Sequence, residues 1–196
     1  MDNQTNQVHQ VETKEAKNSN KCKSLFDILD TIVTVSVLLA IVIAFAFRMA
    51  DVDGVSMMDT LLDRDKLVVS QIFYNPKPGD VVVISRGQLL NHPIVKRVIA
   101  CEGDTLEIDY TSAQVKVNGV VIDEPYIKSP TTQDENGVIP KVIPKGYVFV
   151  MGDNRGNSTD SRSNEVGLID KNNILGKVIW RLWGKGYDVS RFGGVR

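Results

Sequence analysis

The pattern of hydrophobic and polar positions divides the chain into a polar stretch, an apolar run and a longer stretch in which the two kinds of residue are mixed. Residues 1–24 are polar and nearly free of large apolar side chains, so burial cannot offset the entropy of ordering them. We therefore expect a disordered tail over residues 1–27. Between Asp30 and Arg48 the chain is uncharged and mostly apolar (TIVTVSVLLAIVIAFAF), and this run covers about 26 Å as an α-helix. With its apolar flanks it predicts one transmembrane signal-anchor helix over residues 28–49.

Two other structures are compatible with an apolar run near the start of a chain. A buried core helix is disfavoured because the run is apolar on every side and follows a long polar stretch. A cleaved secretory signal is suggested by Ala44-Phe45-Ala46, but these residues lie inside the apolar run rather than after it. Lysines precede the run at positions 14, 17, 21 and 23, and Arg48 is the only nearby cation after it. This bias predicts a cytoplasmic tail and an extracellular domain over residues 50–196.

Short apolar runs alternate with turn-forming residues over 50–196. No run of ten or more residues shows a helical period, so we predict an all-β domain with an antiparallel sheet. Asn118-Gly119 accepts the positive φ angles of a tight primed turn, which predicts a hairpin over Val115–Ile122. Thr131–Gly137 (TTQDENG) has the composition of a mobile loop. The predicted strands are Lys66–Phe73, Asp80–Ile84, Ile94–Ala100, Thr105–Ile108, Gln114–Ile122, Tyr147–Met151 and Gly176–Trp183.

Composition narrows the chemistry that this domain can perform. The formal net charge of -1 leaves no excess of cations to follow a phosphate backbone, so nucleic-acid binding is disfavoured. Two cysteines, Cys22 and Cys101, lie on opposite sides of the predicted membrane and cannot form an intramolecular disulfide. His9 and His92 are the two histidines, and no Cys/His cluster has the spacing of a zinc or haem site. We expect no cofactor, and any chemistry must come from Ser, Lys, Asp, Glu or Tyr.

Two adjacent cations interrupt the apolar strand His92–Ala100 (HPIVKRVIA). Alternation puts Lys96 and Arg97 on opposite faces, so at least one of them enters apolar surroundings. Lysine can lose its proton on burial whereas arginine cannot, which makes Lys96 the candidate for a neutral amine. A shift of its pKa from about 10.4 to ~8 raises the neutral fraction at pH 7 from about one in 2,500 to about one in ten. A lysine that snorkels at a sheet edge is the structural alternative.

Two further segments contain candidate functional groups. Directly after the apolar run, Gly54 permits an unusual backbone angle and Ser56 follows as a possible nucleophile, although the same pattern fits a simple turn hydroxyl. Met57 and Met58 add adaptable apolar surface for packing, lipid or an extended substrate. The second segment, Met151–Arg162 (MGDNRGNSTDSR), has the composition of a structured loop whose charges form ion pairs, which are usually structural. These charged residues are Asp153, Arg155, Asp160 and Arg162.

These three segments, in this order after an apolar anchor, resemble the motifs of bacterial type I signal peptidases, in the small single-span form typical of Gram-positive bacteria. The resemblance covers residues 25–183, and the matching motifs are Gly54–Leu61, Lys96–Asp104 and Gly152–Arg162. It implies a membrane-anchored serine endopeptidase with a Ser/Lys dyad that removes signal peptides from secreted preproteins. The implied fold is an antiparallel β core over residues 50–105 and 143–196, with a small β cap over 106–142.

The resemblance also assigns roles to individual residues. Ser56 would be the nucleophile, with its own N–H as an oxyanion donor, and Lys96 would be the general base. Ser158 would orient the lysine amine. Asp153, Asp160 and Arg162 would support the site, and Met57 and Gly54 match positions beside the nucleophile. The substrate would pair as an extended strand, with small residues at the first and third positions before the cut, and the enzyme is expected to be a monomer.

Two positions depart from the family pattern. Asp59 stands where the family usually has proline; an inward carboxylate would favour the charged form of Lys96, so we predict that Asp59 faces outward. Gly54 replaces a hydroxyl residue of Gram-negative members, which leaves the second oxyanion donor open. The alternatives are a Ser/His hydrolase that uses His92, a catalytically silent homologue that binds exported peptides, and a self-cleaving Ser/Lys regulator related to the repressor proteases.

Overall fold

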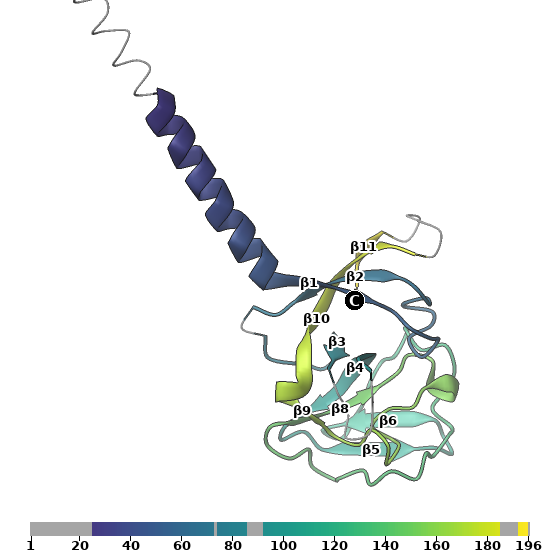
Figure 1. Ribbon diagram of the computed structural model, residues 1–196. Coiled ribbons are helices and arrows are strands. Elements are labelled where there is room, and N and C mark those ends of the chain that lie inside the picture. The colour runs from purple at the N-terminus through teal and green to yellow at the C-terminus, as the bar shows by residue number, and fades with distance from the viewer. Residues whose placement is uncertain (1–24, 73, 86–91, 185–191, 196) are drawn as a thin grey trace, which may run out of the picture. The chain divides into compact units, whose positions relative to one another are not determined.

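The computed structural model describes residues 25–72, 74–85, 92–184 and 192–195 (Figure 1). The chain divides after Phe45 into two units, a helical one and a compact one over Ala46–Arg196. Most of the expected disordered tail, together with Cys22 and His9, lies outside the described residues.

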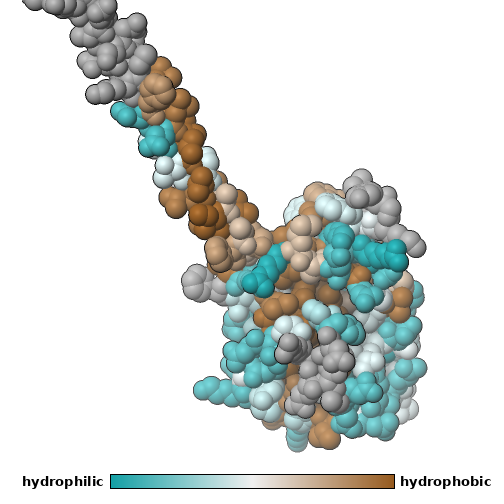
Figure 2. Space-filling view, viewed as in Figure 1, coloured by the Kyte–Doolittle hydropathy of each residue, from teal (hydrophilic) through white to brown (hydrophobic). Residues whose placement is uncertain are grey.

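The first unit is the helix Leu25–Ala46, which is long and apolar enough to cross a membrane. Its 22 residues span about 33 Å, and apolar side chains dominate its visible surface (Figure 2). The hydroxyls of Thr31 and Ser36 donate to backbone carbonyls four residues earlier, so these polar groups are satisfied within the helix. The helix begins and ends three residues earlier than the predicted span 28–49, because residues 47–49 already pair in a strand.

The second unit contains a large antiparallel sheet in the order β1-β2-β10-β3-β4-β8-β9, with β11 paired to β10. Neighbouring strands in this sheet pair antiparallel, which confirms the predicted fold class. Between β8 and β9 lies the 3-10 helix η1 (Arg155–Asn157), and η2 (Lys171–Asn173) precedes β10. The strands of this sheet are β1 (Phe47–Asp51), β2 (Lys66–Ser70), β3 (Val81–Ile84), β4 (Ile94–Cys101), β8 (Tyr147–Met151), β9 (Ile169–Asp170), β10 (Ile174–Trp183) and β11 (Gly193–Gly194).

A smaller antiparallel sheet lies within the stretch predicted as a cap. It consists of β5 (Leu106–Asp109), β6 (Gln114–Val117) and β7 (Val120–Val121). Asn118 and Gly119 both have positive φ, 54° and 78°, so the predicted hairpin turn joins β6 to β7. Leu106 and Val115 pack into the same buried cluster as Phe149 of β8, and this cluster fastens the smaller sheet to the larger one.

The predicted strands match the structure where a short apolar run stands between turn-forming residues. Tyr147–Met151 is confirmed with both ends, and each other predicted run overlaps at least one strand. The sequence pattern missed β1 because its apolar residues look like a continuation of the membrane helix. It missed β9 and β11 because two residues cannot display a period.

The strand β4 determines where the chemistry can occur. It lies between β3 and β8, with Lys96 opposite Val82 and Arg97 opposite Met151. Its six central residues, Val95 to Ala100, are all buried. Because both faces of this strand are covered, both adjacent cations are removed from solvent, not only one of them.

Candidate active site

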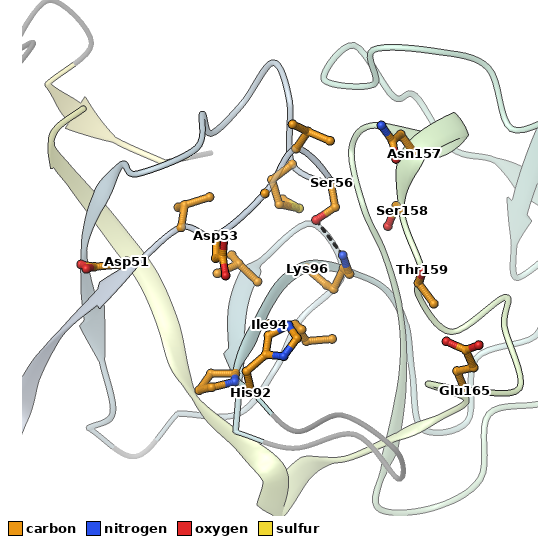
Figure 3. A pocket seen from close by; sticks show the side chains of 16 residues that line it. Asp51, Asp53, Ser56, His92, Ile94, Lys96, Asn157, Ser158, Thr159 and Glu165 are labelled. Carbon is orange, nitrogen blue, oxygen red and sulfur yellow. Dashed lines mark hydrogen bonds between the residues drawn. The ribbon is translucent and has the colours of Figure 1, made fainter. Parts of the chain in front are cut away.

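Ser56 and Lys96 meet in a cavity of about 360 Å³ (Figure 3). The Lys96 amine donates a hydrogen bond to the Ser56 hydroxyl, with 2.7 Å between Nζ and Oγ. Lys96 comes from β4 and is 3% exposed, whereas Ser56 comes from the loop that follows β1. Two residues separated by 40 positions are therefore brought into direct contact at the wall of a pocket large enough for part of a peptide.

Burial makes the amine of Lys96 a usable base. Removal from water lowers its pKa to about 8, because the charged form loses its hydration. The negative charges of Asp160 and Glu135 oppose this decrease and the charge of Arg162 adds to it. At pH 7 about one molecule in ten then has a neutral amine that can accept the serine proton.

The backbone of the loop after β1 holds the nucleophile. Gly54 has φ +94°, a conformation that favours glycine, and its N–H donates to the Asp63 carboxylate at 2.9 Å. Met57 is fully buried in the core beside Leu61, and the Leu61 N–H donates to the Met57 carbonyl. The loop is thus anchored on both sides of Ser56. Because the Gly54 N–H is already bonded to a carboxylate, it is not the open second oxyanion donor.

The loop after β8 supports the nucleophile from the other side. The Asn154 N–H donates to the Ser56 carbonyl at 2.9 Å, and the Asn154 side-chain amide donates to the Val55 carbonyl at 3.1 Å. A Cβ atom at Gly152 would overlap both the Ser56 carbonyl and the Ser158 hydroxyl. Glycine at position 152 therefore allows this loop to approach the nucleophile closely enough for those hydrogen bonds.

Ser158 is buried and lines the same cavity. Its hydroxyl donates to Asp160 Oδ2 at 2.8 Å, and the same carboxylate oxygen accepts the Gly152 N–H at 2.9 Å. A hydroxyl that donates to Asp160 keeps its lone pairs available to accept a proton from an amine. The orientation of Lys96 by Ser158 stays a prediction, since the hydrogen bond of the amine in this structure goes to Ser56.

Buried ion pairs surround the dyad, as expected of the loop Met151–Arg162, but their partners are partly distant in sequence. Asp160 and Arg162 pair within the loop, with 2.9 and 2.8 Å between their bonded atoms. Asp153 instead binds Arg97 of β4 through two hydrogen bonds of 2.8 and 2.7 Å. Arg155 pairs with Glu124, which lies far outside the loop.

Sequence reasoning missed several residues of this support. The pairing of Arg97 with Asp153 joins two motifs that the sequence shows. No local pattern indicates which cation of one motif pairs with which carboxylate of the other. Asn154 lies inside a matching motif and could have been proposed from it. Glu124 and Glu135 stand in stretches of loop composition, where nothing distinguishes them from solvated carboxylates.

The structure shows which way Asp59 faces and whether His92 contacts the serine. The Asp59 side chain is 74% exposed and pairs with Lys128 at 3.3 Å, so it faces outward as predicted. His92 lines the cavity and is exposed, but the serine hydroxyl is bonded to Lys96 (Figure 3). The geometry thus favours lysine over histidine as the base.

Among the described residues, no cluster of His, Cys, Asp or Glu is arranged to hold a metal ion.

Residues 25–183 match the family described as "Signal peptidase, peptidase S26", and the chain belongs to this family. Within it, the chain is a serine endopeptidase of the type I signal peptidase class.

Two relatives cover most of the chain. "Signal peptidase I" of Bacillus licheniformis is 37% identical over 168 residues, which cover 81% of this chain and 88% of the relative. "Signal peptidase IB" of Staphylococcus aureus is 36% identical over 179 residues, covering 82% and 91%. A crystal structure of a signal peptidase I from Enterococcus faecalis is 25% identical and covers 54% of this chain and 97% of that one, with a TM-score of 0.46.

Proposed function

We propose that this chain is a membrane-anchored signal peptidase that cleaves signal peptides from secreted preproteins through an acyl-enzyme, with Ser56 as nucleophile and Lys96 as general base. The observation that carries this proposal is the 2.7 Å hydrogen bond between a buried amine and a cavity-lining hydroxyl. It supplies the two groups that acyl transfer requires, a nucleophile and a base within reach of its proton.

The reaction follows from these positions. Ser56 Oγ attacks the carbonyl carbon before the scissile bond while neutral Lys96 Nζ accepts the hydroxyl proton. The tetrahedral oxyanion receives a hydrogen bond from the Ser56 N–H, a contact worth about 3 kcal/mol in comparable sites. When the peptide bond breaks, the ammonium of Lys96 returns its proton to the departing amine. The neutral amine then deprotonates a water that hydrolyses the ester and frees Ser56.

The walls of the cavity suit an extended peptide with small side chains near the cut. The segment after β1 and the start of β4 both line it, and each brings apolar side chains. A substrate strand between these two segments would place its alternate side chains against Val52 and Val55 on one side and Ile94 and Val95 on the other. Small residues at the first and third positions before the scissile bond are what the similarity to type I signal peptidases implies.

The helix Leu25–Ala46 would deliver the site to its substrate. Ser56 follows the last helical residue by ten positions, so the chain can hold the nucleophile at most about 35 Å from the end of an apolar span. The lysines before the span favour a cytoplasmic tail and an extracellular peptidase domain. A signal peptide held in the same bilayer is thereby concentrated near the enzyme.

Incubation of the detergent-solubilised full chain with a secreted preprotein tests the proposal. We expect wild type to release a mature protein whose new N-terminus, read by Edman sequencing, follows a small residue. The Ser56→Ala variant should leave the preprotein intact, while Ser112→Ala, at an exposed turn of the smaller sheet, should cleave like wild type. A wild-type protein that binds the preprotein and never cuts it would instead establish a silent peptide-binding homologue.

A further inference from the structure

The loop 131–137, which the sequence predicts to be mobile, is joined to the loop that supports the dyad. The Gly137 N–H donates to the Arg162 carbonyl at 2.7 Å, and the Asn164 side-chain amide donates to the Asn136 carbonyl at 2.9 Å. At its other end, Thr131 is buried and accepts a hydrogen bond from Arg155 at 2.6 Å. A Cβ atom at position 137 would overlap the backbone of Arg162, so the two loops are in close contact.

Glu135 lies between these attachment points. Its carboxylate is 3.1 Å from Nη2 of Arg162, and its side chain is 20% exposed. Arg162 is fully buried and already has Asp160 as a bidentate partner, through Nε and Nη2. In the part of the chain that the structure describes, Arg97 and Arg155 are also buried, and they pair with Asp153 and Glu124, respectively. Arg162 therefore has one carboxylate more than its charge requires.

The contacts continue from Glu135 to the dyad. Glu135 contacts Arg162, Arg162 holds Asp160, and Asp160 accepts hydrogen bonds from the Ser158 hydroxyl and the Gly152 N–H. Ser158 lines the cavity, and Gly152 lies against the Ser56 carbonyl. Arg162 is thus held from both sides, by a carboxylate of its own loop and by one from the loop 131–137.

We propose that Glu135 is a positioning residue of the Ser56–Lys96 site, which holds Arg162 from outside and sets the pH range over which the site works. The inference rests on the proposed function. With Asp160 and Arg162 neutralising each other, Glu135 is an excess negative charge near the amine. Its field favours the ammonium form of Lys96, in opposition to burial, and it raises the pKa of Lys96 accordingly.

Other charged and titratable groups act on Lys96 and Glu135, and they are the same residues in wild type and in the Glu135 variants. Lys96 also experiences the charges of Asp160, Arg162 and Asp153, and Asp53, His92 and Glu165 line its cavity. Glu135 itself is raised in pKa, first by burial and then by Asp160, and Arg162 and Lys96 lower it. Burial raises the pKa of the nearby Tyr110 hydroxyl, the charges of Asp134, Asp160 and Glu135 add to this increase, and Arg162 opposes it.

The test compares pH profiles of kcat/KM for signal-peptide cleavage by the full chain in detergent, for wild type, Glu135→Gln, Glu135→Asp and Asp134→Asn. In Glu135→Gln we expect the acid limb to move about half a unit or more toward lower pH and the plateau at high pH to fall severalfold. Glu135→Asp, which keeps the charge, should keep the limb near its wild-type position. Asp134→Asn is the matched control, because its amide oxygen can still accept the Asn136 N–H.

An acid limb that stays in place or moves to higher pH in Glu135→Gln would overturn the inference. A readout without catalysis covers the case in which Glu135→Gln is too inactive to assay. The ¹³Cε resonance of Lys96, identified by its absence in Lys96→Met, is titrated in a Ser56→Ala background with and without Glu135→Gln. A lower midpoint with Glu135→Gln supports the inference and an equal midpoint refutes it. Absence of cleavage by wild type would refute the proposed function instead, and the titration would still decide the role of Glu135.

Discussion

The two faces of β4 bury neighbouring cations to a similar extent but provide them with different hydrogen-bond partners. Lys96 is 3% exposed and Arg97 is 1% exposed. On one face, Arg97 donates hydrogen bonds to both carboxylate oxygens of Asp153 and to the Gly79 carbonyl, and it stacks over the ring of Tyr126 at 3.9 Å. On the other face, the nearest partner of the Lys96 amine is a neutral hydroxyl. The two cations are thus buried alike but differ in side-chain type and in partner: the guanidinium meets a carboxylate, and the amine meets a neutral hydroxyl.

The chemistry of the two side chains fits this division. A guanidinium keeps its proton under all ordinary conditions and binds a carboxylate with two parallel hydrogen bonds, so Arg97 can stabilise the sheet as a permanent charge. An ammonium loses its proton readily when desolvated, so Lys96 can alternate between base and acid. Substitution of each cation in turn, together with the pH profile of the wild-type enzyme, tests this contrast.

Lys96→Arg should have the largest effect, because an arginine cannot accept the proton of Ser56. We expect kcat for preprotein cleavage to fall by about 10³-fold or more, with the fold retained. The measurement is a single-turnover assay in detergent, beside circular dichroism of the same sample. Lys141→Arg, at an exposed position of the chain, is the matched control and should cleave like wild type. An active Lys96→Arg enzyme would remove the general-base assignment and with it the contrast between the faces.

Arg97→Met should lower the stability of the fold more than it affects the catalytic step. The substitution leaves the Asp153 carboxylate buried without its guanidinium, a situation that destabilises proteins by about 3–5 kcal/mol. We expect a clearly lower urea midpoint of the solubilised chain, whereas Arg48→Met, on the exposed strand β1, should change little. Combining Arg97→Met with Asp153→Leu should recover much of the loss. A single variant as stable as wild type would show that Arg97 is not held as a permanent charge.

The pH dependence of the wild-type enzyme should give the smallest of the three effects. With the pKa of Lys96 lowered to about 8, the neutral amine predominates above that pH and is lost as pH falls through it. Between pH 8 and pH 6 we expect kcat/KM to decrease about 50-fold, approaching tenfold per unit at the acid end. The profile is measured on one peptide substrate at constant ionic strength. A flat profile over this range would mean that a different group accepts the proton.

Prediction from sequence succeeded where the information is local. A short apolar run between turn-forming residues located Tyr147–Met151 with both ends, and Asn118-Gly119 located a turn because those residues tolerate positive φ. The same reasoning could not place β10, which is late in the chain yet lies between β2 and β3 in the sheet. Sheet order depends on contacts between distant segments, and the periodicity of a single strand does not record its neighbours.

The amino-acid sequence by itself determined the apolar helix, the β class of the domain and the identity of the serine and lysine that meet in the cavity. Only the tertiary structure decided which of two adjacent cations pairs with a carboxylate, that Glu124 and Glu135 complete the charge network, and how closely the loops approach Ser56. The physical reason is that periodicity and backbone preference act between near neighbours, whereas the charge state of a buried group depends on partners that the fold brings from far along the chain.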